Sequence, residues 1–239
     1  MTGPKAYLFL ALAAVLGTAF VFARSTWLLL VAQSALAYVI LYTDLQRADL
    51  GAGFRHMLFW ALCVSIVTIQ VTLHFPDAAG STILRGEMYR EEMFRYIETG
   101  IGAEGTPRLF LPQHGLHYSL TLVISTLSGG FGGLFLGAIL LDYMNYYVGS
   151  LVRLGEVPSL GALVGWPIWS YVRVAGFIAG AITVAHLFFA RFLRRTRWHP
   201  DAFRRFLYAS VALFLLDIVL KWTLAPMWRQ WLERALPGD

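Results

Sequence analysis

The sequence has few charged residues and one cysteine. Asp, Glu, Lys and Arg make up 14% of its 239 residues, whereas 58% are hydrophobic. Soluble globular chains contain about 25% charged and roughly 45–50% apolar residues. The shortage of charge therefore excludes a water-soluble enzyme and a nucleic-acid-binding domain, and it indicates a polytopic membrane protein. Cys63 is the single cysteine, so the chain forms no internal disulfide.

Catalytic and cofactor signatures are also missing. The zinc-protease motif His-Glu-x-x-His does not occur, and no other motif of this kind rises clearly above background. The leading hypothesis is therefore a protein that is not an enzyme and carries no cofactor. Enzymatic alternatives depend on scattered polar residues rather than on a motif.

Long apolar stretches are what the sequence does contain. A helix needs about 20 mainly apolar residues to cross a hydrocarbon core of about 30 Å. Six stretches qualify, at residues 6–23, 26–42, 56–74, 117–141, 171–190 and 206–224. They predict an all-α polytopic transmembrane helix bundle of about six spans, forming one integral-membrane domain over residues 1–239. Residues 142–170 are ambiguous, because they could be interfacial, re-entrant or a seventh span.

The first stretch and the distribution of arginine predict how the chain enters the membrane. Only Arg24 and Ser25 separate the first two stretches, which favours a retained span over a cleaved signal peptide. Residues 191–205 contain six arginines and one acidic residue, Asp201, and Lys and Arg concentrate in cytoplasmic loops. We therefore expect a bacterial inner (plasma) membrane protein with the 191–205 loop in the cytoplasm. Six spans would place the long loop at 75–115 on the same side, and seven would place it on the other.

Small residues recur at four-residue intervals in two of the predicted spans. They are Ser125, Gly129, Gly133 and Gly137 in the fourth, and Gly176 and Gly180 in the fifth. On a continuous helix this spacing puts them on one face, where small side chains let two helices pack closely in lipid. The pattern predicts packing of the fourth span against the fifth. The alternative is that the glycines at 129–133 unwind the helix to bind an ion or substrate, as in the broken helices of transporters.

The loop at residues 75–115 is longer than a simple connection requires. Within it, residues 86–99 have the pattern of an amphipathic helix, which predicts an ordered interfacial segment. The sharper alternative combines Glu91 and Glu92 with His114 and His117. Carboxylates and imidazoles near a membrane surface could activate water or hold a metal ion, with the two histidines as ligands.

Histidines near span ends raise the alternative of a b-type haem. His56, His74 and His186 are the candidates, because such a haem needs an axial histidine within the membrane. Histidines at these positions are also typical of the membrane interface.

Four charged residues lie within or beside the apolar stretches, where charge is costly and often functional. Asp217 and Lys221 are one helical turn apart and could neutralise each other. Asp142 and Arg173 could pair across two helices. Together the four residues are candidates for a polar path through the bundle.

These patterns favour a multi-span integral membrane subunit or assembly factor of a membrane complex, acting by helix packing and a partner-facing loop. Its partners would be the lipid bilayer and a membrane protein or a second copy of the chain, with no nucleic acid. The first alternative is a small transporter or channel component with a Gly-rich helix and intramembrane charges. Further alternatives are a membrane-embedded hydrolase or metalloenzyme and a b-haem or quinone subunit.

Overall fold

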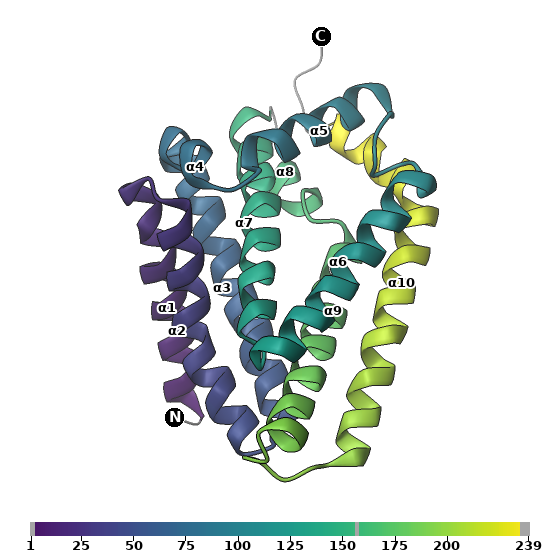
Figure 1. The fold of residues 1–239 in the computed structure, drawn as a ribbon. Coiled ribbons are helices and arrows are strands. Elements are labelled where there is room, and N and C mark those ends of the chain that lie inside the picture. The colour runs from purple at the N-terminus through teal and green to yellow at the C-terminus, as the bar shows by residue number, and fades with distance from the viewer. Residues whose placement is uncertain (1–2, 156–157, 235–239) are drawn as a thin grey trace.

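The computed structural model describes residues 3–155 and 158–234, and in these residues it contains helices and no strand (Figure 1). Seven long helices run along the molecule: α1 (Pro4–Thr18), α2 (Thr26–Gln46), α3 (Leu50–His74), α6 (Pro107–Ser128), α7 (Phe131–Leu154), α9 (Ile168–Leu187) and α10 (Pro200–Glu233). A 3-10 helix, η1 (Ala19–Ala23), extends α1, and a π-helix, η2 (Phe188–Phe192), extends α9. Three short helices, α4 (Pro76–Thr82), α5 (Gly86–Thr99) and α8 (Pro158–Val164), complete the described chain.

Six helical segments of the described chain are long and apolar enough to cross a membrane, which confirms an all-α polytopic bundle. They are Pro4–Ala23, Thr26–Gln46, Leu50–His74, Phe131–Leu154, Ile168–Phe192 and Pro200–Glu233. The remaining long helix, α6, is not among these segments. It carries Arg108, His114 and His117, so its composition is more polar.

The predicted fourth span, residues 117–141, is wrong. The chain turns at Gly129 and Gly130, whose φ angles of 61° and 97° lie in the left-handed region that glycine adopts without a steric penalty. Residues 117–128 therefore belong to α6, and residues 131–141 begin α7. The segment at 142–170 is neither re-entrant nor a separate span. Its described part contains the second half of α7, then α8 and the start of α9.

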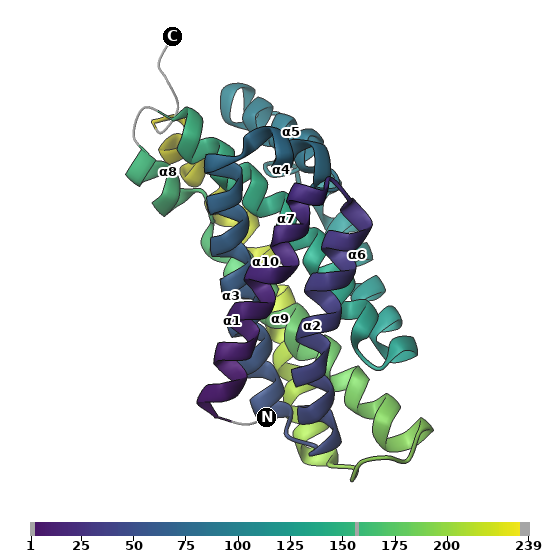
Figure 2. The same cartoon turned by 90° about the vertical axis from the view of Figure 1, so that its left-hand side faces the viewer.

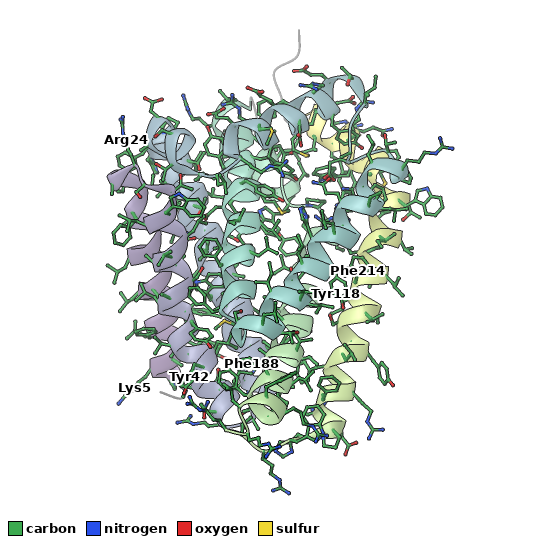
Figure 3. The ribbon with its side chains drawn as sticks, viewed as in Figure 1. Lys5, Arg24, Tyr42, Tyr118, Phe188 and Phe214 are labelled. Carbon is green, nitrogen blue, oxygen red and sulfur yellow. The ribbon has the colours of Figure 1, made fainter. Side chains whose placement is uncertain are left out.

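The α6–α7 turn changes the arrangement of the loops. Because α6 descends into the bundle and α7 returns, α4 and α5 lie at one end of the molecule while the connection from η2 to α10 lies at the other (Figure 1). The loop at 75–115 and the 191–205 segment are thus at opposite ends. Figure 3 shows the same polarity in its labelled side chains, with Lys5 near the end that holds Tyr42 and Phe188, and Arg24 at the opposite end.

Helices α1, α2 and α3 form one side of the bundle, with α7 behind them (Figure 2). The main apolar core lies between these four helices and α9, and includes Leu10, Ile40, Trp60 and Ala138. Helix α6 is joined to α10 by Tyr118, whose ring stacks on Phe214 at a centroid distance of 4.4 Å (Figure 3). The core thus fixes α7 at the centre, between the α1–α3 side and the α6, α9 and α10 side.

The small residues are divided among several interfaces. Ser125 and Gly129 belong to α6 and its turn, whereas Gly133 and Gly137 belong to α7, so no single helix face carries the predicted ladder. A Cβ atom on Gly133 would collide with Ser125, which shows that this glycine allows α6 and α7 to approach. On α9, Gly176 and Gly180 face Ser210 of α10, and Ser210 Oγ donates to the Gly176 carbonyl at 2.7 Å. The closest packing of α9 at these glycines is therefore against α10.

Helix α5 rests on the bundle through its apolar side. Met93, Tyr96 and Ile97 are buried there. The Tyr96 hydroxyl donates to the Ala225 carbonyl of α10 at 3.1 Å, and Arg229 Nε donates to the Ile97 carbonyl at 2.8 Å. These contacts hold α5 across the ends of α7 and α10.

Candidate functional site

A buried ion pair joins α9 to α10. Arg173 Nε and Nη2 each lie 3.0 Å from one carboxylate oxygen of Asp217, so the contact is bidentate. The side chain of Asp217 is fully buried and that of Arg173 is 14% exposed. A planar guanidinium matches a carboxylate in this geometry and forms strong charge-assisted hydrogen bonds. The pair keeps both charges neutralised among apolar helices.

Lys221 of α10 forms a second ion pair, with Glu104 rather than with Asp217. Lys221 Nζ lies 2.9 Å from Glu104 Oε1 and 4.8 Å from the centre of the Phe110 ring. The predicted neutralisation of Asp217 by Lys221 is therefore corrected. Glu104 was missing from the predicted site, and its only sequence signal is an acidic residue between Gly102 and Gly105.

A small polar cavity lies beside these ion pairs, with a volume of about 40 Å³. Its lining comes from α5, α6, α7, α9 and the α5–α6 loop, and includes Tyr89, Glu92, Tyr96, Glu104, His114, His117, Tyr143, Met144 and Arg173. A cavity needs about 10–15 Å³ to hold one water molecule, so this one has room for a few. We refer to it as the polar cavity.

The polar cavity brings together three of the four predicted catalytic candidates. Glu92, His114 and His117 line it, whereas Glu91 is exposed and is not among its lining residues. His114 Nδ1 lies 3.6 Å from Asp217 Oδ2, beyond hydrogen-bond distance. In the described residues no three His, Cys, Asp or Glu side chains are grouped to hold a metal ion. The lining offers hydroxyl, imidazole, guanidinium and carboxylate groups that can bind water or a polar ligand group.

Two tyrosines of α5, Tyr89 and Tyr96, line the polar cavity. Burial, followed by the nearby Glu104 carboxylate, raises the pKa of Tyr96 to about 12. Burial also raises the pKa of Tyr89 well above its ordinary value, and Glu104 adds to this effect. Both phenols therefore stay protonated at neutral pH and can donate hydrogen bonds.

A second, mostly apolar cavity of about 90 Å³ lies next to the polar cavity in the bundle. Residues of α2, α3, α6, α7 and α9 line it, and it shares His117, Tyr143, Met144 and Arg173 with the polar cavity. Along α7 its lining runs from Gly130 to Met144, a length of about 20 Å at 1.5 Å per residue. We call it the α7 chamber.

Glycines give the α7 chamber its width. Gly130, Gly133 and Gly137 all line it. A Cβ atom added at Gly137 would meet no other atom within 4 Å, so this glycine faces open space rather than a packed helix. The glycine spacing therefore serves a cavity as well as helix packing.

Asp142 lies away from Arg173, so the predicted pair between them is not formed. Asp142 Oδ1 accepts hydrogen bonds from Gln33 Nε2 at 3.2 Å and from Thr68 Oγ1 at 3.1 Å. Of the four predicted polar-path residues, Arg173, Asp217 and Lys221 thus gather near the polar cavity, and Asp142 faces the α1–α3 side.

The haem candidates lie in three different environments. His56 Nδ1 is 2.7 Å from Asp44 Oδ2, whereas His186 stacks on Trp198 at a centroid distance of 5.6 Å. His74 is exposed at the end of α3. None of the three lines the polar cavity or the α7 chamber.

Comparisons with models of protein families, with curated proteins and with solved structures find no match to this chain. The fold and its cavities define a multi-pass helical membrane protein with an internal chamber and buried ion pairs.

Proposed function

We propose that this protein is a small membrane transporter for an amphipathic solute, with the α7 chamber as its path. The observation that carries the proposal is the length and lining of the chamber. It follows α7 for about 20 Å, against a hydrocarbon core of about 30 Å, and it meets charged residues at one end. The chamber is lined as ligand sites typically are, by apolar residues with a few polar groups, but its volume of about 90 Å³ is below their usual roughly 300–1,000 Å³ and fits only a small solute.

The charged end suits the polar group of such a solute. Arg173 lines both cavities and its guanidinium is oriented by Asp217. His117 also lines both cavities. Ionisable residues inside membrane proteins commonly mark substrate or proton pathways. In this proposal Arg173 and His117 bind the polar group while the apolar part of the solute occupies the space beside Gly133 and Gly137.

The distribution of charge supports an orientation for the path. The 191–205 loop alone contains six arginines and one acidic residue, Asp201, and it lies at the end of the molecule that contains the start of α1 (Figure 1). Positive residues favour the cytoplasmic side. We therefore propose that the 191–205 loop is cytoplasmic in a bacterial inner membrane and that the polar cavity faces the outside.

The role of a subunit or assembly factor is the second candidate. An apolar groove of about 830 Å³ between α8, α9 and α10 favours it, with Trp166, Trp169, Trp228 and Trp231 among the lining residues. Against it, α5 uses its apolar side on its own bundle, which leaves mainly charged residues for a partner. A protein that co-purifies in stoichiometric amounts and is lost on Trp231→Ala would support this second role.

The path is tested by thiol labelling in sealed membrane vesicles. Gly137→Cys and Ala138→Cys are each introduced into a Cys63→Ser background, and a charged, membrane-impermeant thiol reagent is added from either side. Residue 137 lines the α7 chamber, whereas Ala138 is fully buried in the core. Labelling at 137 and not at 138 supports a water-accessible path. Absence of labelling at both positions from both sides contradicts it.

A further inference from the structure

The carboxylate of Asp142 is buried in the α1–α3 side of the bundle without a counter-charge. Asp142 is 2% exposed, and within the described residues it takes part in no ion pair. Two hydrogen bonds reach Oδ1, but Oδ2 is buried and has no hydrogen-bond partner among these residues. A bare carboxylate among membrane helices is costly, so this arrangement calls for a positively charged ligand.

Polar side chains from four helices form one hydrogen-bonded group that includes this carboxylate: Gln33 and Thr68 donate to Asp142, and Gln33 also donates to Thr18. Thr18 ends α1, Gln33 lies on α2, Thr68 on α3 and Asp142 on α7. Gln33 Nε2 donates to Thr18 Oγ1 at 3.1 Å and to Asp142 Oδ1 at 3.2 Å. These two hydrogen bonds hold the Gln33 amide between Thr18 and Asp142. The oxygen of the same amide, Gln33 Oε1, is buried and has no hydrogen-bond partner in the described chain.

The backbone of α1 is shaped around this group. A Cβ atom on Gly17 would lie 2.8 Å from Gln33 Cα, so glycine is needed for α1 to touch α2 here. Directly after Thr18 the helix tightens into the 3-10 helix η1. A 3-10 turn is common at the end of a helix, so the close contact at Gly17 is the feature that shapes α1 at this group.

We propose that Thr18, Gln33, Thr68 and Asp142 bind a monovalent alkali cation, with Na⁺ as the expected ion. Carboxylate, amide and hydroxyl oxygens are the ligands that hard cations prefer. One carboxylate balances one positive charge, whereas a divalent ion would leave net charge in an apolar interior. A proton would satisfy Asp142 Oδ2 as well, and the effect of acidic pH distinguishes it from a cation. Cation binding does not depend on the proposed transport role, although Asp142 adjoins Tyr143, which lines the α7 chamber.

The site is tested by the melting temperature of the purified full chain in detergent, in NaCl, KCl and choline chloride at equal ionic strength. A ligand that binds only the folded state raises stability with a saturable dependence on its concentration. We expect NaCl to raise the melting temperature in this way and choline chloride not to do so. Equal melting temperatures in the three salts would overturn the proposal, as would stabilisation by acidic pH that replaces the effect of NaCl.

Variants on α3 and α7 assign the effect to these residues. Asp142→Asn should abolish the Na⁺ dependence, and Thr68→Val should weaken Na⁺ binding by at least about tenfold, as loss of a supporting metal-site group does. Thr72→Val is the matched control, because Thr72 is equally buried but its hydroxyl donates to the Thr68 carbonyl and not to Asp142. An unchanged Na⁺ dependence in both Asp142→Asn and Thr68→Val would contradict the site.

Direct binding of ²²Na⁺ to the wild-type chain keeps the test decisive if Asp142→Asn does not fold. Saturable binding that Thr68→Val weakens and Thr72→Val preserves supports the site, and no saturable binding overturns it. The thiol labelling at residue 137 requires no sodium. Failure of the cation site is therefore distinguishable from failure of the proposed path.

Discussion

At the residue scale, the ion pair between Arg173 and Asp217 is central to the candidate site, because it fixes the guanidinium at the junction of the two cavities. Both residues could be identified from the sequence, since a charge inside an apolar stretch is visible there. Their pairing could not be predicted, because it depends on how α9 and α10 are rotated against each other. Helical spacing favours Lys221 as the partner of Asp217, but Asp217 pairs with Arg173, and Lys221 pairs with the loop residue Glu104.

Removal of one member of this pair should be costly. Asp217→Asn leaves Arg173 with an uncompensated buried charge, which destabilises proteins by about 3–5 kcal/mol. The double variant Arg173→Gln with Asp217→Asn should recover much of that loss, because no unpaired charge remains. Unfolding in mixed detergents measures the free energy of unfolding of the wild type, of Asp217→Asn and of the double variant. Strictly additive losses in the double variant would contradict the coupling.

At the element scale, α6 and α7 form a hairpin, and Gly133 and Gly137, one turn apart on α7, have different surroundings. The sequence showed the four-residue spacing but not the turn, because Gly129 and Gly130 also suit a continuous transmembrane helix. Only the contacts distinguish the roles: Gly133 faces Ser125 across the hairpin, and Gly137 faces open space.

A matched pair of substitutions on α7 tests this difference. Gly133→Leu should destabilise the bundle by roughly 1–3 kcal/mol or more, since it overpacks the contact with α6. Gly137→Leu should leave a folded, monodisperse protein with a filled chamber. Melting temperatures and size-exclusion profiles of the two variants are the measurements. Equal losses at both positions would show that the glycines act only in packing.

Tyr96 of α5 makes the free energy of unfolding depend on pH. Because burial raises the pKa of Tyr96 from 10.0 to about 12 in the folded protein, folding favours the neutral phenol. Its contribution is fully present below pH 10 and is lost as the pH rises through about 12. Between pH 10 and about 12, we expect the free energy of unfolding to fall less in Tyr96→Phe than in the wild type. Parallel unfolding curves across this range would argue against the buried phenol.

At the scale of the whole molecule, seven lengthwise helices place the start of α1 and the end of α10 at opposite ends (Figure 1). The all-α membrane class followed from composition and apolar stretches, and six apolar segments confirm it. The order in which the helices cross the bundle could not be predicted from composition. Helix α6 contains Pro112, Gln113 and two histidines and therefore lacks the composition of a span. Because the sequence does not identify α6 as a lengthwise helix, it does not determine the relative sides of the 75–115 and 191–205 loops.

The topology predicts opposite locations for two engineered cysteines. In a Cys63→Ser background, Thr196→Cys in the 191–205 loop should react only after the vesicle interior is exposed, in vesicles with the cytoplasmic side inside. Ser81→Cys on α4 should react from outside without permeabilisation. Reaction of both cysteines from the same side would contradict the arrangement of seven lengthwise helices.

The proposed transport path requires that water reach the α7 chamber, which is measured by the labelling rate of Gly137→Cys relative to Ala138→Cys. The two residues are adjacent on α7, so they share depth in the membrane but differ in which space they face. We expect the cysteine at 137 to react from the α5 end and Gly137→Leu to fill the same space. No reaction at 137 from either side would contradict an internal path and would favour the subunit role.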